Sequence, residues 1–229
     1  MNTNHTIARD ASSTLALETN KVLRNTYLLL SITLIFSAIT AGLSVAINPP
    51  WFTGLICSLV ALALVWFVLP RTANSAAGLG VVFGITGLLG FGLGPVLSHY
   101  LSVPNGAQIV MQAMGATGAI FVGLSAYVLT TKKDFSFMGG FLMAGMILAI
   151  VAMLALLVAG LFGFHMPVLG LALSGVVALL MAGFILYDTS RIINGGETNY
   201  IMATVGLYLS IYNLFSSLLQ LIGATSGDD

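Results

Sequence analysis

Seven long runs of apolar residues follow one another along the chain, separated by short segments that contain polar residues, proline and glycine. Each run is about 20 residues long, which is the length a helix needs to cross the hydrocarbon core of a bilayer. The runs cover 27–47, 51–69, 78–98, 107–129, 137–162, 167–187 and 200–222. This pattern predicts an all-α integral membrane protein, built as a bundle of seven transmembrane helices.

The segments between the runs carry the residues that interrupt helices. Proline, asparagine and glycine are concentrated at 48–50, Pro70, 103–106 and 194–196, where each helix is expected to end. These connections leave no room for a separate soluble domain. The chain is expected to divide into a polar N-terminal tail at 1–25, a membrane domain at 26–223 and a short C-terminal tail at 224–229.

Composition agrees with this interpretation and excludes other classes. The 229 residues include seven Lys or Arg and seven Asp or Glu, so 6% are charged, 58% are hydrophobic and the mean hydropathy is +1.04. A soluble domain carries about 25% charged residues, and a disordered chain is polar. The net charge of zero argues against a nucleic-acid partner, which would require a basic face. The single cysteine, Cys57, cannot form an intrachain disulfide.

The cations indicate an orientation. With seven spans, all of them fall on one side of the membrane: Arg9, Lys21, Arg24, Arg71, Lys132, Lys133 and Arg191. The positive-inside rule makes this side cytoplasmic and leaves the C-terminus outside. The tail at 1–25 lacks the apolar segment of a signal peptide. It is expected to be either a flexible solvated tail or a segment that another protein grips.

The third span, 78–98, is dense in glycine. Gly80 and Gly84, and likewise Gly90 and Gly94, have the spacing that allows helix backbones to approach closely. Tight packing within the bundle is the first interpretation. Homodimerisation and a mobile, kinked helix are the alternatives.

The last span, 200–222, carries a polar stripe on one helical face. Its members, with Tyr208 and Tyr212 beside them, are Gly206, Ser210, Asn213, Ser217 and Gln220. Lipid offers polar groups no hydrogen-bond partners, so the stripe should point into the bundle and place the seventh helix near the centre. The stripe could hold helices together, or it could form a polar path or a partner-binding groove.

Asp188 is the one carboxylate contiguous with an apolar run. It could be structural and pair with Arg191 or Arg71, or it could be a gate that takes up a proton or a cation. Glu197, in the connection to the last span, is expected to be solvated or to cap the next helix.

The sequence contains few patterns that would indicate an enzyme. No close metal-ligand spacing of the HExxH kind occurs, so metal-dependent hydrolysis is unsupported. The segment 123–126, Gly-Leu-Ser-Ala, is superficially similar to the nucleophile motif of intramembrane serine proteases, but no histidine lies in a later span. We expect a protein that is not an enzyme.

Several segments together resemble the Bax inhibitor family of small seven-helix membrane proteins. They are GPVLSHY at 94–100, KKDFSF at 132–137, LYDT at 186–189 and LYLSIYNLF at 207–215. The resemblance runs from about residue 20 to residue 223. The segments KVLRNTY at 21–27 and GGETNY at 195–200 are similar to the bacterial branch that modulates the membrane AAA protease FtsH.

The resemblance implies two functions of different classes. In the FtsH-modulating branch, the protein binds the protease complex, slows degradation of other membrane proteins and is gripped by its cytosolic tail, which here includes Arg9, Lys21 and Arg24. Elsewhere in the family, proteins act as pH-sensitive calcium leak channels. In those, a carboxylate that ends the sixth span pairs with a second carboxylate in the seventh.

This chain keeps half of that device. Asp188 matches the first acid, whereas Ser210 stands at the second position and cannot ionise. Arg71 corresponds to a basic residue that could latch Asp188. We therefore expect an inner-membrane regulator of FtsH, with a calcium or cation leak as the alternative. For ion passage the candidates are Asp188, Arg71, Ser210 and Asn213, and Asp188 is the candidate calcium ligand. No other cofactor is expected.

Overall fold

The structure is a computed structural model that describes residues 3–164 and 166–226, with side chains from residue 19 onward. The described chain is helical, with short connections. Its elements are α1 (Thr3–Ile47), α2 (Phe52–Ala63), the π-helix η1 (Leu64–Val68), α3 (Leu69–Thr72), α4 (Ala76–Leu101), α5 (Gly106–Thr131), the 3-10 helix η2 (Ser136–Met138), α6 (Gly139–Leu161), α7 (Pro167–Ile193) and α8 (Tyr200–Thr225).

Seven helical segments of the described chain are long and apolar enough to cross a membrane, which confirms the seven predicted spans. The second is composite, because α2, η1 and α3 follow one another without a break. Large apolar side chains on the outer faces, such as Leu148 and Leu157 on α6, are exposed and form the surface that lipid would cover. The protein is therefore a multi-pass membrane protein.

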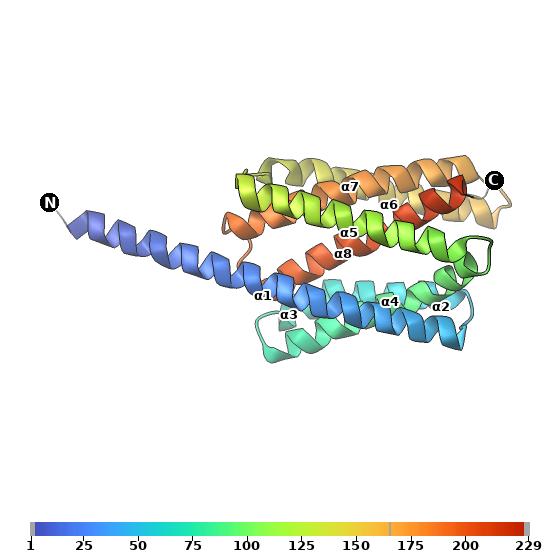
Figure 1. Ribbon diagram of the computed structural model, residues 1–229, viewed down its shortest axis with the longest axis horizontal. Helices are drawn as coiled ribbons and strands as arrows, with labels where there is room; N and C mark the ends of the chain where they lie inside the picture. Colours follow the sequence, from blue (N-terminus) through green and yellow to red (C-terminus); the bar gives the residue numbers. More distant parts are fainter. Residues whose placement is uncertain (1–2, 165, 227–229) are drawn as a thin grey trace.

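Helix α8 lies at the centre of the bundle, as the polar stripe predicted. Figure 1 shows it running diagonally between α1, α2 and α4 on one side and α5, α6 and α7 on the other. It contacts α1, α4, α5 and α7, and its span has the largest buried share of the seven. Leu207, Tyr208 and Leu214 on this helix are fully buried in the hydrophobic core.

One predicted helix end was wrong, and another helix begins earlier than its apolar run. The backbone of the polar segment at 1–25 is helical from Thr3 and continues into the first span as one helix of 45 residues. Pro70 was expected to end the second helix, but it lies at the start of α3, directly after the π-helix η1, and the helical backbone continues to Thr72. Arg71 consequently lies in the last turn of a helix and not in a loop.

The connections that carry the cations gather at one end of the bundle. Asn199, before α8, donates through Nδ2 to the carbonyl oxygen of Ala73 at 3.1 Å and to Oδ1 of Asn74 at 2.7 Å. The backbone N–H of Phe135, between α5 and α6, donates to the Ser190 hydroxyl near the end of α7 at 2.8 Å. We call this the cation-bearing end.

The glycines of α4 divide between two environments. A Cβ atom at Gly90 would overlap the carbonyl oxygen of Ser37 and the hydroxyl of Thr40, so this glycine brings α4 into backbone contact with α1. Gly94 lies equally close to Ser44. In contrast, a Cβ at Gly80 would meet nothing within 4 Å. Tight packing within the bundle is therefore confirmed for the Gly90/Gly94 pair but not for Gly80.

Candidate functional site at the cation-bearing end

A cavity of about 220 Å³ opens where η1 and α3, the end of α7 and the beginning of α8 meet. Its walls are apolar, with Val65, Leu69, Met202 and Leu209 among them, while its polar groups come from Asp188, Arg191 and Glu197. A mainly apolar cavity with a few convergent polar groups is the usual form of a binding site in proteins. This cavity is therefore the candidate functional site.

Asp188 reaches the cavity because α8 offers no side chain at the facing position. A Cβ atom at Gly206 would lie 3.2 Å from Asp188 Oδ2, closer than most such contacts. The glycine thus allows the carboxylate to lie against the backbone of α8. Asp188 makes no ion pair with any side chain that the structure describes, and it lies five residues before the end of α7, within the helix.

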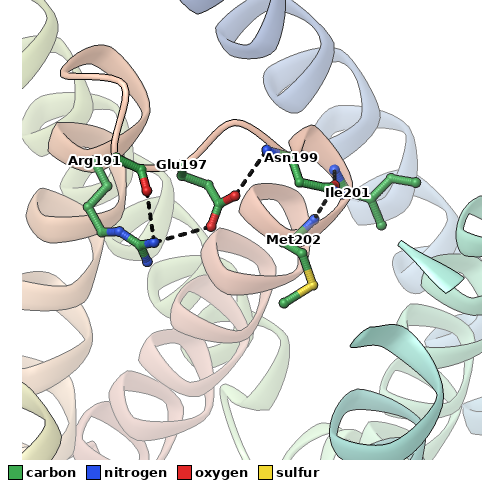
Figure 2. Close-up of polar contacts among 6 residues, drawn as sticks. Arg191, Glu197, Asn199, Ile201 and Met202 are labelled. Carbon is green, nitrogen blue, oxygen red and sulfur yellow. Dashed lines mark hydrogen bonds and ion pairs between the residues drawn. The ribbon is translucent and has the colours of Figure 1, made fainter. Parts of the chain in front are cut away.

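The ion pair of this site joins Arg191 to Glu197, with Nη2 3.3 Å from Oε2 (Figure 2). The end of α7 makes it possible. Gly195 has φ +75°, and the N–H of Gly196 donates to the carbonyl oxygen of Arg191 at 2.8 Å, as in a Schellman motif. The chain therefore folds back and places Glu197 beside the Arg191 side chain. The pairing of Arg191 with Asp188, expected from their spacing, does not form.

Asn199 caps α8, a role that sequence reasoning had offered to Glu197. Its Oδ1 accepts hydrogen bonds from the backbone N–H groups of Ile201 at 2.9 Å and Met202 at 3.2 Å (Figure 2). Glu197 Oε1 instead accepts from the backbone N–H of Asn199 at 3.0 Å, so it holds the cap in place. The order Asn199-Tyr200-Ile201-Met202 carries the sequence signal of a helix N-terminus.

Arg71 does not latch Asp188 in this structure. Its guanidinium Nη1 donates to the carbonyl oxygen of Phe67, one turn earlier. That carbonyl belongs to the π-helix η1, in which the regular helical hydrogen bonds are rearranged. Two other members of η1 and α3, Val65 and Leu69, line the cavity itself, so the π-helix forms part of its wall.

The polar stripe of α8 points inward only in part. Ser210 and Ser217 are buried, whereas Gln220 is exposed and accepts a hydrogen bond from Ser174 on α7 at 2.8 Å. Ser210 donates to the carbonyl oxygen of Gly206 at 3.1 Å, and Asn213 donates to that of Leu209 at 2.8 Å. Neither of these two side chains is among those that line the cavity with Asp188.

Sequence reasoning missed hydroxyl contacts that link helices near the site. Tyr208, fully buried, has its hydroxyl 2.6 Å from that of Ser37 on α1 and 3.3 Å from the carbonyl oxygen of Thr86 on α4. Ser125 on α5 lies 3.4 Å from the Thr189 hydroxyl, beside Asp188 in the chain. The buried hydroxyl residues of α1 are Thr26, Thr33, Ser37 and Ser44. Their spacing of seven, four and seven residues places them on one helical face, and this spacing could have indicated the contacts from the sequence.

The predicted tail residues are described in part. Lys21 and Arg24 are exposed on α1, outside the hydrophobic core. Arg9 lies outside the residues whose side chains the structure describes. All three belong to the same continuous helix, which extends from the bundle at its N-terminal end (Figure 1).

Chemically, the cavity offers one carboxylate without an ion-pair partner, one ion pair and apolar walls. In the described part of the chain, no group of three or more His, Cys, Asp or Glu side chains is arranged to hold a metal ion. The arrangement suits proton uptake or a transient contact with a cation better than tight metal binding, which requires several oxygen ligands.

Comparisons with known proteins point to one family. Residues 19–227 match the family model described as inhibitor of apoptosis-promoting Bax1. The chain is 51% identical over 212 residues to a protein of Escherichia coli K12 named modulator of FtsH protease YccA, with 93% of this chain and 94% of that protein aligned. It is 50% identical over 221 residues to an uncharacterized membrane protein of Vibrio cholerae, covering 96% of this chain and 97% of the relative. A protein of Pseudomonas aeruginosa is 46% identical, with 93% of each chain covered.

Proposed function

The chain belongs to the Bax inhibitor family, and on this premise we propose that it is a non-enzymatic inner-membrane regulator that binds the protease FtsH and modulates degradation of membrane proteins. The observation that carries the proposal is the 51% identity to the modulator YccA over nearly the whole of both chains. The regulated step is access of other substrates to the protease.

The proposed orientation places the N-terminus in the cytoplasm and the C-terminus in the periplasm. Arg71, in the last turn of α3, and the connection that bears Lys132 and Lys133 lie at the same end of the bundle. Cytoplasmic connections carry an excess of Lys and Arg. The cavity with Asp188 then opens at the cytoplasmic end, on the side where the N-terminal part of α1 leaves the bundle.

The N-terminal part of α1 is the proposed segment that FtsH grips. The helix begins at Thr3, whereas its membrane-spanning part begins at Thr19. The sixteen positions from Thr3 to Glu18 therefore precede the span, a length of about 24 Å at 1.5 Å per residue. A segment of this length is accessible to a partner without any change in the bundle.

Co-purification tests this proposal. Full-length protein and a variant without residues 2–18 are extracted in detergent, and the FtsH recovered with each is measured. We expect FtsH to be recovered with the full-length protein and to be reduced with the shortened one. Deletion of residues 227–229, at the opposite end of the chain, is the control and should leave the recovery unchanged.

A degradation assay completes the test. Full-length protein added to reconstituted FtsH should slow the degradation of a second membrane substrate, and the variant without residues 2–18 should slow it less. If the full-length protein neither co-purifies with FtsH nor protects that substrate, the proposal is wrong.

Asp188 favours a second candidate, a pH-gated calcium or cation leak. Its carboxylate lines the cavity without an ion-pair partner among the described side chains. The leak ranks second because Ser210, at the position of the family's other acid, donates its hydroxyl to the carbonyl oxygen of Gly206. A hydroxyl cannot share a proton with Asp188 as a second carboxyl would.

Calcium flux into proteoliposomes at several pH values separates the two candidates. The informative variant is Asp188→Asn, and Asp134→Asn is its matched control, because it removes the same charge outside the cavity. Flux that depends on pH and is altered by Asp188→Asn alone would rank the leak first. Absence of calcium flux with the wild-type protein would exclude the leak as a candidate function.

A further inference from the structure

The connection between α5 and α6, residues 132–138, presents two adjacent cations at the cation-bearing end. Lys132 and Lys133 are both exposed. Lys132 ends α5 in the left-handed region, with φ +52°, and its N–H donates to the carbonyl oxygen of Val128 at 2.8 Å. The chain therefore turns sharply at the lysine pair and runs along the end of the bundle before α6 begins.

Ser190 of α7 fixes this connection. Its hydroxyl accepts from the N–H of Phe135 at 2.8 Å and from Asn194 Nδ2 at 3.2 Å, and it donates to the carbonyl oxygen of Lys133 at 3.3 Å. Asp134 Oδ1 accepts from the N–H of Ser136 at 2.8 Å. The backbone that carries the lysines is therefore held in one conformation.

The Lys133 side chain is also oriented. Its Nζ donates to the Tyr127 hydroxyl at 3.1 Å and lies 5.7 Å from the centre of the ring. Both groups are exposed, and Tyr127 is on α5 near the end of its span. The ammonium group is thus held beside the exposed surface of α5.

Two phenylalanines follow the lysines on the outer surface. Phe137 is 80% exposed and Phe141 is 73% exposed, and they are four residues apart at the beginning of the span Ser136–Leu161. Exposed apolar rings at the end of a transmembrane segment face lipid, near the boundary between headgroups and acyl chains. Cations followed by exposed aromatic rings match the order of headgroup and acyl chain in a leaflet.

We infer that Lys132, Lys133, Phe137 and Phe141 form a binding site for an anionic phospholipid of the leaflet at the cation-bearing end. The two ammonium groups engage the headgroup phosphate, and the phenyl rings pack against the acyl chains. The charge of the exposed lysines selects an anion as the occupant. The nearby carboxylate of Asp134 forms no ion pair with them within the described chain and instead accepts hydrogen bonds from Ser136 and Ser190. This inference does not depend on the proposed function.

Native mass spectrometry of the full-length protein tests the inference. Wild type, a Lys132→Gln/Lys133→Gln variant and a Lys21→Gln/Arg24→Gln control, which loses the same charge at the same end, are titrated with phosphatidylglycerol and with phosphatidylcholine. We expect the first variant to bind phosphatidylglycerol at least about tenfold more weakly, since each cation near an anionic surface contributes about fivefold. The control should bind as the wild type does, and phosphatidylcholine should not distinguish the three.

Two further measurements complete the test. A Lys132→Arg/Lys133→Arg variant should retain binding, because it keeps both charges. Excess inorganic phosphate should displace little phosphatidylglycerol, because it lacks the acyl chains. An equal loss in the control variant, unchanged binding after both lysines are replaced, or displacement by free phosphate would overturn the inference.

Discussion

Arg191 pairs with Glu197, six residues ahead across the turn after α7, although Asp188 lies one helical turn behind it in the same cavity. The Schellman motif at Gly195 decides between the two acids, because it folds the chain back onto the guanidinium. Asp188 therefore forms no ion pair with any of the described side chains.

A double-mutant cycle measures this choice of partner. We expect Arg191→Gln and Glu197→Gln to show a coupling of about 0.5–1 kcal/mol, since the two side chains remain 34% and 20% exposed and solvent weakens such pairs. The same cycle with Asp188→Asn in place of Glu197→Gln should give a smaller value. Thermal unfolding in detergent provides the measurement, and a larger coupling with Asp188 would show that the ion pair in the membrane is different.

Gly90 and Gly80 form a matched pair on α4. Gly90→Ala should lower the free energy of unfolding by about 2 kcal/mol or more, because the new methyl group meets backbone and hydroxyl atoms of α1 that cannot withdraw freely. Gly80→Ala, in open space on the same helix, should be neutral or stabilise by about 0.5–1 kcal/mol. Unfolding of both variants in the same detergent compares them, and equal effects would contradict the contact with α1.

Tyr208→Phe removes the hydroxyl that joins three helices. We expect a loss of about 1–3 kcal/mol, because the buried Ser37 hydroxyl loses its partner and the Thr86 carbonyl oxygen loses a second one. Tyr212→Phe is the control, since its ring stacks on Tyr208 and its hydroxyl forms no hydrogen bond within the described chain. Chemical denaturation should place the Tyr208 variant below the control, and the reverse order would exclude this role.

The connection at 132–138 should loosen in acid. Hydrogen bonds from Ser136 hold the pKa of Asp134 below its usual value, so the ionised carboxylate is the form that the fold favours. Its stabilising contribution is present above the usual carboxyl pKa and is lost as the pH falls through the lowered one. The thermal midpoint of the wild type should exceed that of Asp134→Asn at neutral pH, and the difference should disappear in acid. A difference that does not change with pH would contradict this origin.

Much of the architecture could be predicted from the sequence because a bilayer imposes strong rules. Runs of about 20 apolar residues have few alternatives to spanning helices, and a helix with Ser210 and Ser217 on one face must turn that face inward. The same rule predicted that Gln220 would be buried, but this side chain is exposed, close to the end of its span.

The details of the site could not be predicted, because they depend on backbone turns and on pairs distant in sequence. The spacing in the sequence suggested an ion pair between Asp188 and Arg191. The turn at Gly195, which has a positive φ, brings Glu197 to Arg191 instead. From the sequence, Asn199 and Glu197 are both candidates for the cap of α8. The conformation of the turn determines that Asn199 is the cap and that Glu197 binds the N–H of Asn199. The contact of Tyr208 with Ser37 joins residues 171 positions apart, so no local pattern contains it.

The unbroken course of α1 gives the protein a mechanical property. From Thr3 to Ile47 one helix connects the segment before the membrane to the surface where Gly90 and Gly94 contact Ser37 and Ser44. A pulling force on the N-terminal end is carried along the helix axis to that surface, with no loose linker to absorb it. The contacts of the membrane-spanning part of α1 with α4 and α8 therefore resist extraction of the chain from its N-terminal end.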